Sequence, residues 1–417
     1  MKILFVTPQL PYPPDKGATI RTLAMIKGLA QRGHQIQLLS FINCEDDLVW
    51  LPQIRPYVTG IATVQIPQRS MLTRLSRFVF SSRPDMAWRL PSAEFADTLG
   101  NMLRQDNYDI VQFESIEVAQ YALQAIEQRA PGAKKPVIVF DDLNAEFLLQ
   151  KRAFEIDRKS LRKWPKAFYS WVQWRRLRSY EARVCTTVDR VLAVSETDAA
   201  VLRDLHNGIN VTVVPNGVDC AFFSPSARPA DYAEPNRIKH LAAIVFTGTM
   251  DFRPNADAVV WFCQEMLPLI KKHFYHVHFY IVGKGPTPEV RALASPAVTV
   301  TGYVSDIRPY IVNSQVYVVP MRMGSGTKLK VMEAMAMKIP VVSTTMGAEG
   351  IDVTPGQHLL LGDNPAEFAQ HVMDLLENAA ERQRLATNAR RLVEEKYDWI
   401  TIVPSLEKIY TQALLSM

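Results

Sequence analysis

The 417 residues are too many for one typical hydrophobic core and suit two domains of about 200 residues each. A hydrophobic content of 48% with 21% charged residues is that of a folded soluble protein. The formal net charge of +5 excludes a strongly basic or acidic chain. It does not choose between anionic substrates, a membrane surface and nucleic acid.

The lengths of the apolar runs bear on the cellular compartment, and the spacing of the cysteines bears on disulfide and metal chemistry. The apolar stretch within Met1–Thr7 is too short for a signal peptide or a membrane span, and no run of about 18 apolar residues occurs elsewhere. We therefore expect a cytoplasmic protein. Four scattered cysteines, without Cys-x-x-Cys spacing or a matching histidine cluster, predict structural thiols and no metal site: Cys44, Cys185, Cys220 and Cys263.

The first half of the chain alternates predicted strands and helices. Ile3–Val6 is predicted to be a buried strand, followed by a proline-rich loop and a helix over Thr19–Arg32. Further strands are predicted at His34–Ser40, Asp109–Phe113, Pro136–Phe140 and Arg190–Val194. This order is typical of a doubly wound α/β sheet.

The second half repeats the pattern after a boundary near Val214–Asp219 and the polar, proline-containing segment Ser224–Pro235. Two successive series of this kind predict two doubly wound sheets. The strands predicted in the second series are Ile244–Gly248, Val277–Val282, Val298–Thr301, Val316–Pro320 and Pro340–Ser343.

The segment Arg322–Gly350 is the most informative part of the chain. A buried strand leads into a Gly-Ser-Gly-Thr turn, where Gly324 and Gly326 allow tight backbone passage. A helix is predicted from about Lys328, with Thr327 or Ser325 as its cap. The free N–H groups and the positive end of the helix dipole suit an anion.

Charged side chains extend this predicted anion site. Lys328 and Lys330 add positive charge, and Glu333 lies about two turns into the helix, too deep to form a capping box with Thr327. Donors for a diphosphate and a carboxylate for ribose hydroxyls are what a sugar nucleotide requires. The alternative is an ordinary strand–turn–helix connection, which a glycine-rich turn alone does not exclude.

These residues resemble the donor site of retaining glycosyltransferases of family 4. That family has the α/β GT-B fold of two Rossmann-like doubly wound domains facing across a cleft. Many members carry two glutamates eight positions apart, the first facing the sugar and the second the ribose. Glu333 matches the second, and Ser325 stands where the first would be. This departure matches a Gly-Ser-Gly-Thr-Lys branch involved in cell-surface polysaccharide synthesis.

The resemblance implies a domain organisation and further donor contacts. Residues 1–215 would bind the acceptor, residues 216–399 would bind the nucleotide sugar, and a C-terminal helix over 400–417 would return to the first domain. Arg253 and Lys328 would neutralise the diphosphate and act in catalysis with Ser325, because Thr249 replaces the arginine usual in the family. The other implied donor-binding residues are Gly17, Gly248, Gly283, Tyr303, Gly324, Gly326, Thr327 and Glu333.

Three residues of the first domain are candidates for acceptor chemistry. Asp141 and Asp142 follow a predicted strand, where many relatives have a histidine that touches the sugar. These acids would bind acceptor hydroxyls, act as a base or hold a divalent ion; the alternative is a helix cap by Asp142 or Asn144. Arg21 lies one turn into the first helix as an anion contact, and we assign Asp141 a catalytic role.

A basic, aromatic segment lies between Gln150 and Arg183. The stretch Lys151–Arg178 holds ten cations and two acids, interleaved with Trp164, Phe168 and other aromatic residues. This mixture suits an anionic membrane interface or a phosphorylated lipid acceptor, with Ser70–Arg89 as a second such segment. The alternative is a long helix with an aromatic core face and a solvated cationic face. No nucleic-acid-binding module is recognisable.

Together these observations predict a retaining glycosyltransferase that uses a UDP- or GDP-linked sugar, a hydroxyl acceptor and no cofactor. The acceptor would be lipid-linked if the basic, aromatic segment binds a membrane. The protein would be cytoplasmic and peripheral at the inner face of the cell membrane. Two other classes stay open: a sugar-nucleotide epimerase of the same fold, and a non-catalytic nucleotide-binding or membrane scaffold protein.

Overall fold

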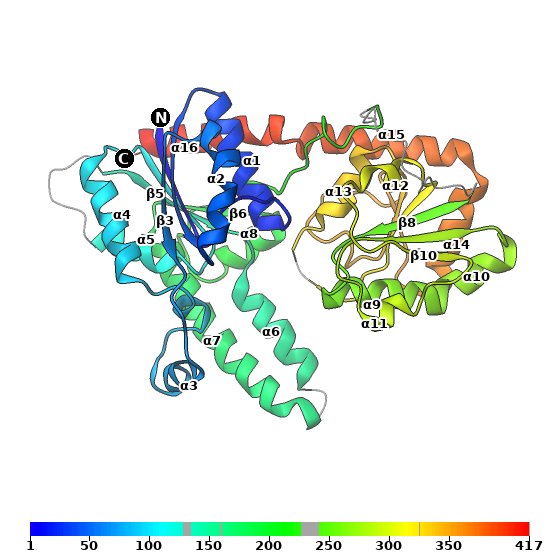
Figure 1. The fold of residues 1–417 in the computed structure, drawn as a ribbon, viewed down its shortest axis with the longest axis horizontal. Coiled ribbons are helices and arrows are strands. Elements are labelled where there is room, and N and C mark those ends of the chain that lie inside the picture. The colour runs from blue at the N-terminus through cyan, green and yellow to red at the C-terminus, as the bar shows by residue number, and fades with distance from the viewer. Residues whose placement is uncertain (128–134, 159–160, 227–241, 325, 417) are drawn as a thin grey trace. The chain divides into compact units, whose positions relative to one another are not determined.

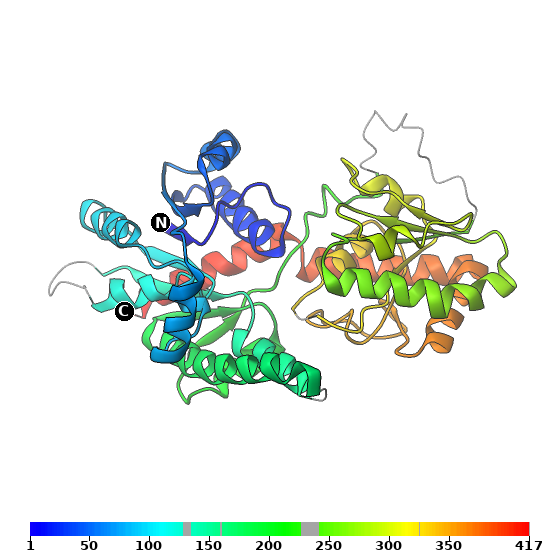
Figure 2. The same ribbon diagram turned by 60° about the horizontal axis from the view of Figure 1, so that its bottom comes forward.

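The computed structural model describes residues 1–127, 135–158, 161–226, 242–324 and 326–416. The chain divides into two compact units. Unit 1 comprises Met1–Pro215 together with Val403–Met417, and unit 2 comprises Asn216–Ile402. Figure 1 and Figure 2 show that each unit is built around one sheet with helices packed beside it.

Unit 1 contains a seven-stranded sheet in the order β3-β2-β1-β4-β5-β6-β7, and all its strand pairs are parallel. The order reverses between β1 and β4, as in doubly wound folds. The strands are β1 (Lys2–Thr7), β2 (Gln35–Ile42), β3 (Gly60–Gln65), β4 (Ile110–Glu114), β5 (Val137–Asp142), β6 (Arg190–Ala193) and β7 (Val211–Val213).

Helices of unit 1 connect these strands, and the C-terminal helix packs on the same unit. The α-helices are α1 (Gly17–Gln31), α2 (Leu51–Ile54), α3 (Met71–Phe80), α4 (Ala93–Gln105), α5 (Ala119–Glu127), α6 (Glu146–Asp157), α7 (Trp164–Thr187), α8 (Glu196–Arg203) and α16 (Trp399–Leu415). Short 3-10 helices cover Glu45–Trp50, Arg55–Tyr57, Met86–Trp88 and Leu161–Lys163.

Unit 2 contains a six-stranded sheet in the order β10-β9-β8-β11-β12-β13, again with parallel pairs. Its strands are β8 (Ala243–Thr247), β9 (His278–Val282), β10 (Val298–Val300), β11 (Val316–Val319), β12 (Val341–Ser343) and β13 (Leu360–Leu361). Its helices are α9 (Arg253–Trp261), a π-helix (Phe262–Met266), α10 (Leu267–His273), α11 (Pro288–Arg291), α12 (Arg308–Val312), α13 (Leu329–Ala336), α14 (Pro365–Glu377) and α15 (Ala379–Lys396).

The central strands are buried on both faces. Every residue of β8, β9 and β11 is buried. A parallel strand covered by helices on both sides must be apolar along its whole length, so it appears in the sequence as a continuous apolar run. That property made these strands predictable, and the two parallel sheets confirm the predicted α/β fold class.

The part of α16 that follows Ile402 is fastened to the rest of unit 1 by polar contacts. Glu407 accepts a hydrogen bond from Arg32 and lies 3.0 Å from His34 Nε2. The Tyr410 hydroxyl donates to Gln112 inside the unit. Close packing supports these contacts, because a Cβ at Gly28 of α1 would lie 2.5 Å from the Val403 side chain. The part of α16 from Val403 onward therefore belongs to unit 1, whereas its first residues, Trp399–Ile402, belong to unit 2.

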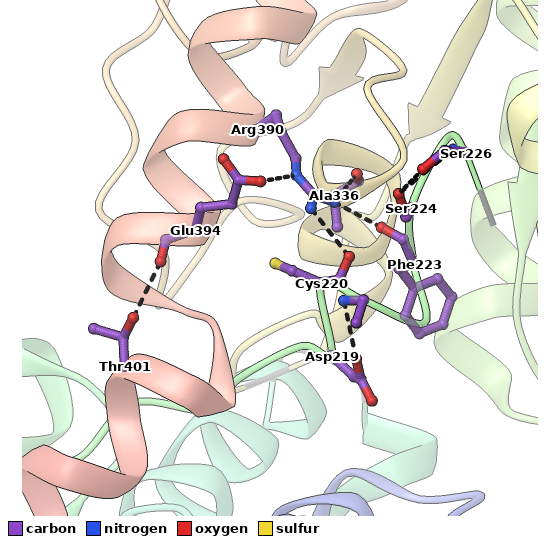
Figure 3. Close-up of polar contacts among 10 residues, drawn as sticks. Asp219, Cys220, Phe223, Ser224, Ser226, Ala336, Arg390, Glu394 and Thr401 are labelled. Atoms are coloured by element: carbon purple, nitrogen blue, oxygen red, sulfur yellow. Dashed lines mark hydrogen bonds and ion pairs between the residues drawn. The ribbon is translucent and has the colours of Figure 1, made fainter.

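Within unit 2, Arg390 of α15 joins three segments (Figure 3). Its guanidinium donates to the carbonyls of Cys220 at 3.0 Å and Phe223 at 2.8 Å, and to that of Ala336. Its Nε also donates to Glu394 at 2.7 Å. Ala336 is the last residue of α13, where a cation interacts favourably with the helix dipole and the unpaired carbonyls. Arg390 thus fixes the C-terminal end of α13, the helix that carries Glu333.

Candidate functional site

The strand order of unit 2 reverses between β8 and β11, which are neighbours in the sheet. The chain therefore leaves these two strands in opposite directions at their carboxyl ends. Open α/β sheets bind ligands in the crevice at such a point. The loops there are 248–252 after β8 and 320–328 after β11. They contain four of the donor-binding residues predicted from the sequence, Gly248, Gly324, Gly326 and Thr327.

The loops after β8 and β9 are in close backbone contact. The Gly248 N–H donates to the Val282 carbonyl at 3.0 Å. Gly283 has φ +146°, and a Cβ at this position would lie 1.8 Å from the Gly248 carbonyl oxygen. Only glycine fits at Gly283, because any side chain would overlap the neighbouring backbone. This backbone packing is enough to explain both glycines, whether or not a ligand binds beside them.

The turn after β11 differs in detail from its prediction. The helix α13 begins at Leu329, and Lys328 occupies the capping position without a side-chain capping hydrogen bond. The Thr327 hydroxyl instead donates to the Gly350 carbonyl at 3.5 Å. The predicted cap by Thr327 is therefore wrong, and Ser325 lies outside the described residues. The positive φ angles of 127° at Gly324 and 67° at Gly326 confirm the tight turn that the two glycines predict.

Lys328 is folded back onto this turn and is almost buried. Its Nζ donates to the Gly326 carbonyl at 2.6 Å and lies 3.9 Å from a Glu349 carboxylate oxygen. Glu349 belongs to the loop after β12, so the loops after β11 and β12 meet around this ammonium group. A cation held against a turn of this kind is positioned to bind an anion there.

A second cation, Lys330, lies at the same point of the sheet. Its Nζ donates to Asn255 Oδ1 at 2.7 Å and sits 4.0 Å from the centroid of the Phe246 ring. A Cβ at Gly248 would lie 2.9 Å from this Nζ, which places the ammonium group beside the loop after β8. In the sequence, Lys330 is recognisable only as additional positive charge. Its contacts are with residues more than 70 positions away, which no local pattern indicates.

Lys330 and Glu333 form an electrostatically coupled pair on α13. Burial lowers the pKa of Lys330 to about 7, against the opposing effect of the Glu333 carboxylate. Burial raises the pKa of Glu333 to about 7, which the Lys330 charge limits. Burial and the same carboxylate raise the pKa of Tyr317, whose hydroxyl is 2.6 Å from Thr247 Oγ1 at the end of β8. Perturbed groups gathered in this way mark a candidate functional site.

Arg253 and Tyr303 border the same edge of the sheet. Arg253 is exposed and is the first residue of α9, directly after the loop from β8. Tyr303 follows β10, and its side chain is 76% exposed, so it does not pack in the core. The loop that carries it is tied to the others because the Gly283 N–H donates to the Gly302 carbonyl at 3.2 Å.

The predicted acceptor residues of unit 1 are mostly buried against each other. Arg21 Nε and Nη2 donate to the two Asp141 carboxylate oxygens at 2.8 and 2.9 Å. The Arg21 side chain is 1% exposed and that of Asp141 0%. The structure thus favours a structural ion pair over the predicted contacts of Arg21 with an anion and of Asp141 with a reacting sugar. Gly17 is the first residue of α1.

Further buried carboxylates surround this ion pair at the ends of β4 and β5. Burial and the Asp141 charge raise the pKa of Glu114 to about 8. Asp142 is buried with Oδ2 lacking a hydrogen-bond partner, and burial followed by the Glu181 charge raises its pKa. Glu181 of α7 accepts the N–H groups of Glu146 at 2.9 Å and Phe147 at 2.8 Å. It caps α6 in place of Asp142 or Asn144.

Among the residues that the structure describes, there is neither a metal-binding cluster nor a membrane-spanning helix. No group of three or more histidine, cysteine, aspartate or glutamate side chains is arranged to hold a metal ion there. Across the same residues, no helix combines the length and the apolar character needed to cross a bilayer.

Comparison with known proteins agrees with this geometry. The model of Glycosyltransferase Family 4 matches residues 16–222, and that of Glycosyl transferases group 1 matches residues 242–378. A Klebsiella pneumoniae protein described as an uncharacterized 44.6 kDa protein in the cps region is 23% identical over 98% of this chain and 99% of its own length. The phosphatidyl-myo-inositol mannosyltransferase of Mycobacterium leprae is 25% identical over 49% of this chain and 54% of its own.

A solved structure supports the fold across both units. The Anabaena protein HepE in complex with UDP-glucose has a TM-score of 0.65 and 15% sequence identity, over 99% of this chain and 100% of its own. Together with the two parallel sheets, this likeness establishes the GT-B fold. The chain therefore belongs to the glycosyltransferases, with a domain of glycosyltransferase family 4 in its first half and a domain of glycosyl transferases group 1 in its second.

Proposed function

We propose that the protein transfers a sugar from a UDP- or GDP-linked donor to a hydroxyl acceptor with retention at the anomeric carbon, without a cofactor. The observation that carries this proposal is the grouping of Lys328, Lys330 and Glu333 around the start of α13, with Lys328 on the turn after β11 and Lys330 beside the loop after β8, at the reversal point of the unit 2 sheet. Cations for a diphosphate and a carboxylate for ribose hydroxyls lie within two turns of one helix.

Each group has a role in this proposal. The backbone of Gly324–Thr327, with Arg253 and Lys328, would stabilise the charge that develops on the departing diphosphate, the most effective kind of electrostatic catalysis. The leaving phosphate would accept the proton of the acceptor hydroxyl. Glu333 would accept hydrogen bonds from the ribose. Ser325 takes the position at which many relatives carry a glutamate that faces the sugar.

The acceptor would be a glycan or a lipid-linked sugar in exopolysaccharide, lipopolysaccharide or glycolipid synthesis, bound by unit 1. Two comparisons support this choice. The K. pneumoniae relative is described by its place in a cps region, and the M. leprae relative is named for a lipid acceptor.

A panel of sugar nucleotides tests the proposal. We expect a UDP- or GDP-sugar to raise the melting temperature more than ADP- or dTDP-sugars do, because a ligand of the native state stabilises it by mass action. Product analysis with the stabilising donor then separates the classes. A transferase releases the nucleoside diphosphate slowly without acceptor, an epimerase yields an isomeric donor, and a scaffold protein does neither.

Glu333→Gln is expected to weaken donor binding by about 1.5–3 kcal/mol, because it removes a charged hydrogen-bond acceptor from the ribose. Titration calorimetry of the sugar nucleotide measures this change. Glu265→Gln, the same substitution at an exposed position of unit 2, is the matched control and should bind as the parent does. Equal affinity in the parent and in Glu333→Gln would show that Glu333 does not hold the ribose.

Donor binding at pH 8 is expected to take up about one proton. The pKa of Lys330 is lowered to about 7 by burial, so at pH 8 its amine is mostly neutral. A bound diphosphate favours the charged form, raises this pKa and draws a proton from the buffer. Calorimetry in buffers of different ionisation enthalpy measures the uptake. Lys330→Met should abolish it, and an uptake unchanged in that variant would exclude Lys330 as its source.

A further inference from the structure

A pair of helices projects from the sheet of unit 1. The helices α6 and α7 pack along each other, and Figure 1 shows both running away from the strands. The helix α3 packs against α7: the rings of Phe78 and Tyr169 stack at 5.4 Å, and Arg176 donates to the Phe78 carbonyl at 2.8 Å. Tyr169 and Arg176 are therefore engaged in holding α3.

A different stripe of α7 faces solvent. Trp164, Phe168 and Trp171 follow one another at helical spacing, and the stripe continues with Arg175 and Arg178. Trp164 is 60% exposed and Phe168 58%, at the end of α7 that is near the end of α6. Large apolar side chains gathered on an exposed surface mark an interaction site.

Ile156 adds to the apolar end of this surface. It lies one residue before the end of α6 and is 59% exposed. We call Ile156, Trp164, Phe168, Trp171, Arg175 and Arg178 the α7 face.

The exposed charge of α7 has one sign, whereas the adjoining end of α6 adds two acids beside Ile156: Glu155, 3.9 Å from Lys151, and Asp157, 3.6 Å from Lys163. The helix α7 is described throughout and contains one acidic residue, Glu181, which is 0% exposed and caps α6 from inside the unit. Its exposed cations include Arg175 and Arg178, and the Arg175 guanidinium lies 5.3 Å from the centroid of the Trp171 ring. Exposed aromatic residues followed by cations, without an exposed carboxylate on the helix, complement an anionic and partly apolar surface.

We propose that the α7 face binds an anionic lipid bilayer peripherally. Trp164 and Phe168 would enter the interfacial layer, where aromatic side chains are favoured, and Arg175 and Arg178 would contact lipid phosphates. The binding itself does not depend on donor chemistry. Its use, to bring the enzyme to a lipid-linked acceptor, rests on the proposed function.

Vesicle flotation of the full chain tests the proposal, with phosphatidylcholine vesicles that contain or lack phosphatidylglycerol. The parent should float with anionic vesicles at low salt and much less at about 0.5 M salt, because screening weakens exposed charges. Arg175→Ser with Arg178→Ser should weaken binding about thirtyfold, which corresponds to about 1 kcal/mol for each arginine. Trp164→Ser with Phe168→Ser should also reduce flotation.

Control variants in unit 2 show whether flotation depends on the α7 face or on any exposed cation or aromatic side chain. Lys271→Ser with Lys272→Ser removes two exposed cations from unit 2, and Tyr275→Ser removes an aromatic side chain that is 76% exposed. Both should float as the parent does. Circular dichroism melting confirms that every variant is folded.

Three results would overturn the proposal. The first is a parent protein that does not float at low salt, and the second is a loss of binding in Lys271→Ser with Lys272→Ser as large as that in Arg175→Ser with Arg178→Ser. The third is a dimer, seen by sedimentation without vesicles, that the α7 variants dissociate. The last result would assign the face to a second copy of this chain. Glu333→Gln, which is expected to weaken donor binding, should float as the parent does. A parent protein that binds the donor but does not float contradicts this inference and leaves the proposed function untouched.

Discussion

Replacing Lys328 or Arg253 with alanine is expected to slow sugar transfer at saturating donor by about 30- to 1,000-fold. This range corresponds to roughly 2–4 kcal/mol of barrier, the usual effect of removing one preorganised group that stabilises developing charge. Lys328 is held in place before any ligand binds, by the Gly326 carbonyl and the Glu349 carboxylate. Arg253 is exposed at the first position of α9 and reaches the same edge of the sheet.

Steady-state kinetics with a matched control measures this effect. Arg291→Ala removes an exposed arginine of α11 in the same unit and should leave turnover unchanged. A variant of Lys328 or Arg253 that turns over normally at saturating donor would remove that residue from the diphosphate site. An effect confined to KM would assign it to ground-state binding instead.

Arg21→Met is expected to destabilise unit 1 by about 3–5 kcal/mol. The substitution leaves the Asp141 carboxylate buried without its bidentate partner, and an uncompensated buried charge is strongly unfavourable. The neighbouring Glu114, whose pKa is raised to about 8 by burial and the Asp141 charge, is itself an acid and does not replace the lost cation. Hydrogen exchange of the amides of β1, β4 and β5 measures this loss in unit 1 alone.

The double variant Arg21→Met with Asp141→Leu provides the control. Replacing both members of a buried pair with apolar residues removes the unpaired charge, so much of the lost stability should return. If Arg21→Met costs less than about 1 kcal/mol, the pair does not carry the structural role assigned to it here.

The sheets were predictable because their central strands are buried on both faces. The apolar run predicted as Ile244–Gly248 is β8 (Ala243–Thr247), and the one predicted as Val316–Pro320 is β11. The two-residue strand β13 carries too little pattern to be recognised. Both turn glycines after β11 were also predictable, because a positive φ angle has a direct residue signature.

The polar contacts that organise the two units were not predictable, because their partners are distant in sequence. Arg21 and Asp141 are 120 positions apart, and Lys330 is 75 positions from Asn255. Glu181 caps α6 from 35 positions away, whereas the expected caps were the local residues Asp142 and Asn144. Local sequence patterns identify residues whose side chains could bind a ligand or cap a helix. Only the fold decides whether a charge faces a ligand or another side chain.

The donor site at the reversal point of the unit 2 sheet can be tested by hydrogen exchange of the full chain with and without the stabilising sugar nucleotide. We expect the donor to slow exchange in peptides covering 248–255 and 324–333, where the loops after β8 and β11 meet the start of α13. Glu333→Gln should reduce this protection at the same donor concentration. Protection elsewhere in the chain, with these two segments unchanged, would contradict a donor site at the reversal point of the unit 2 sheet.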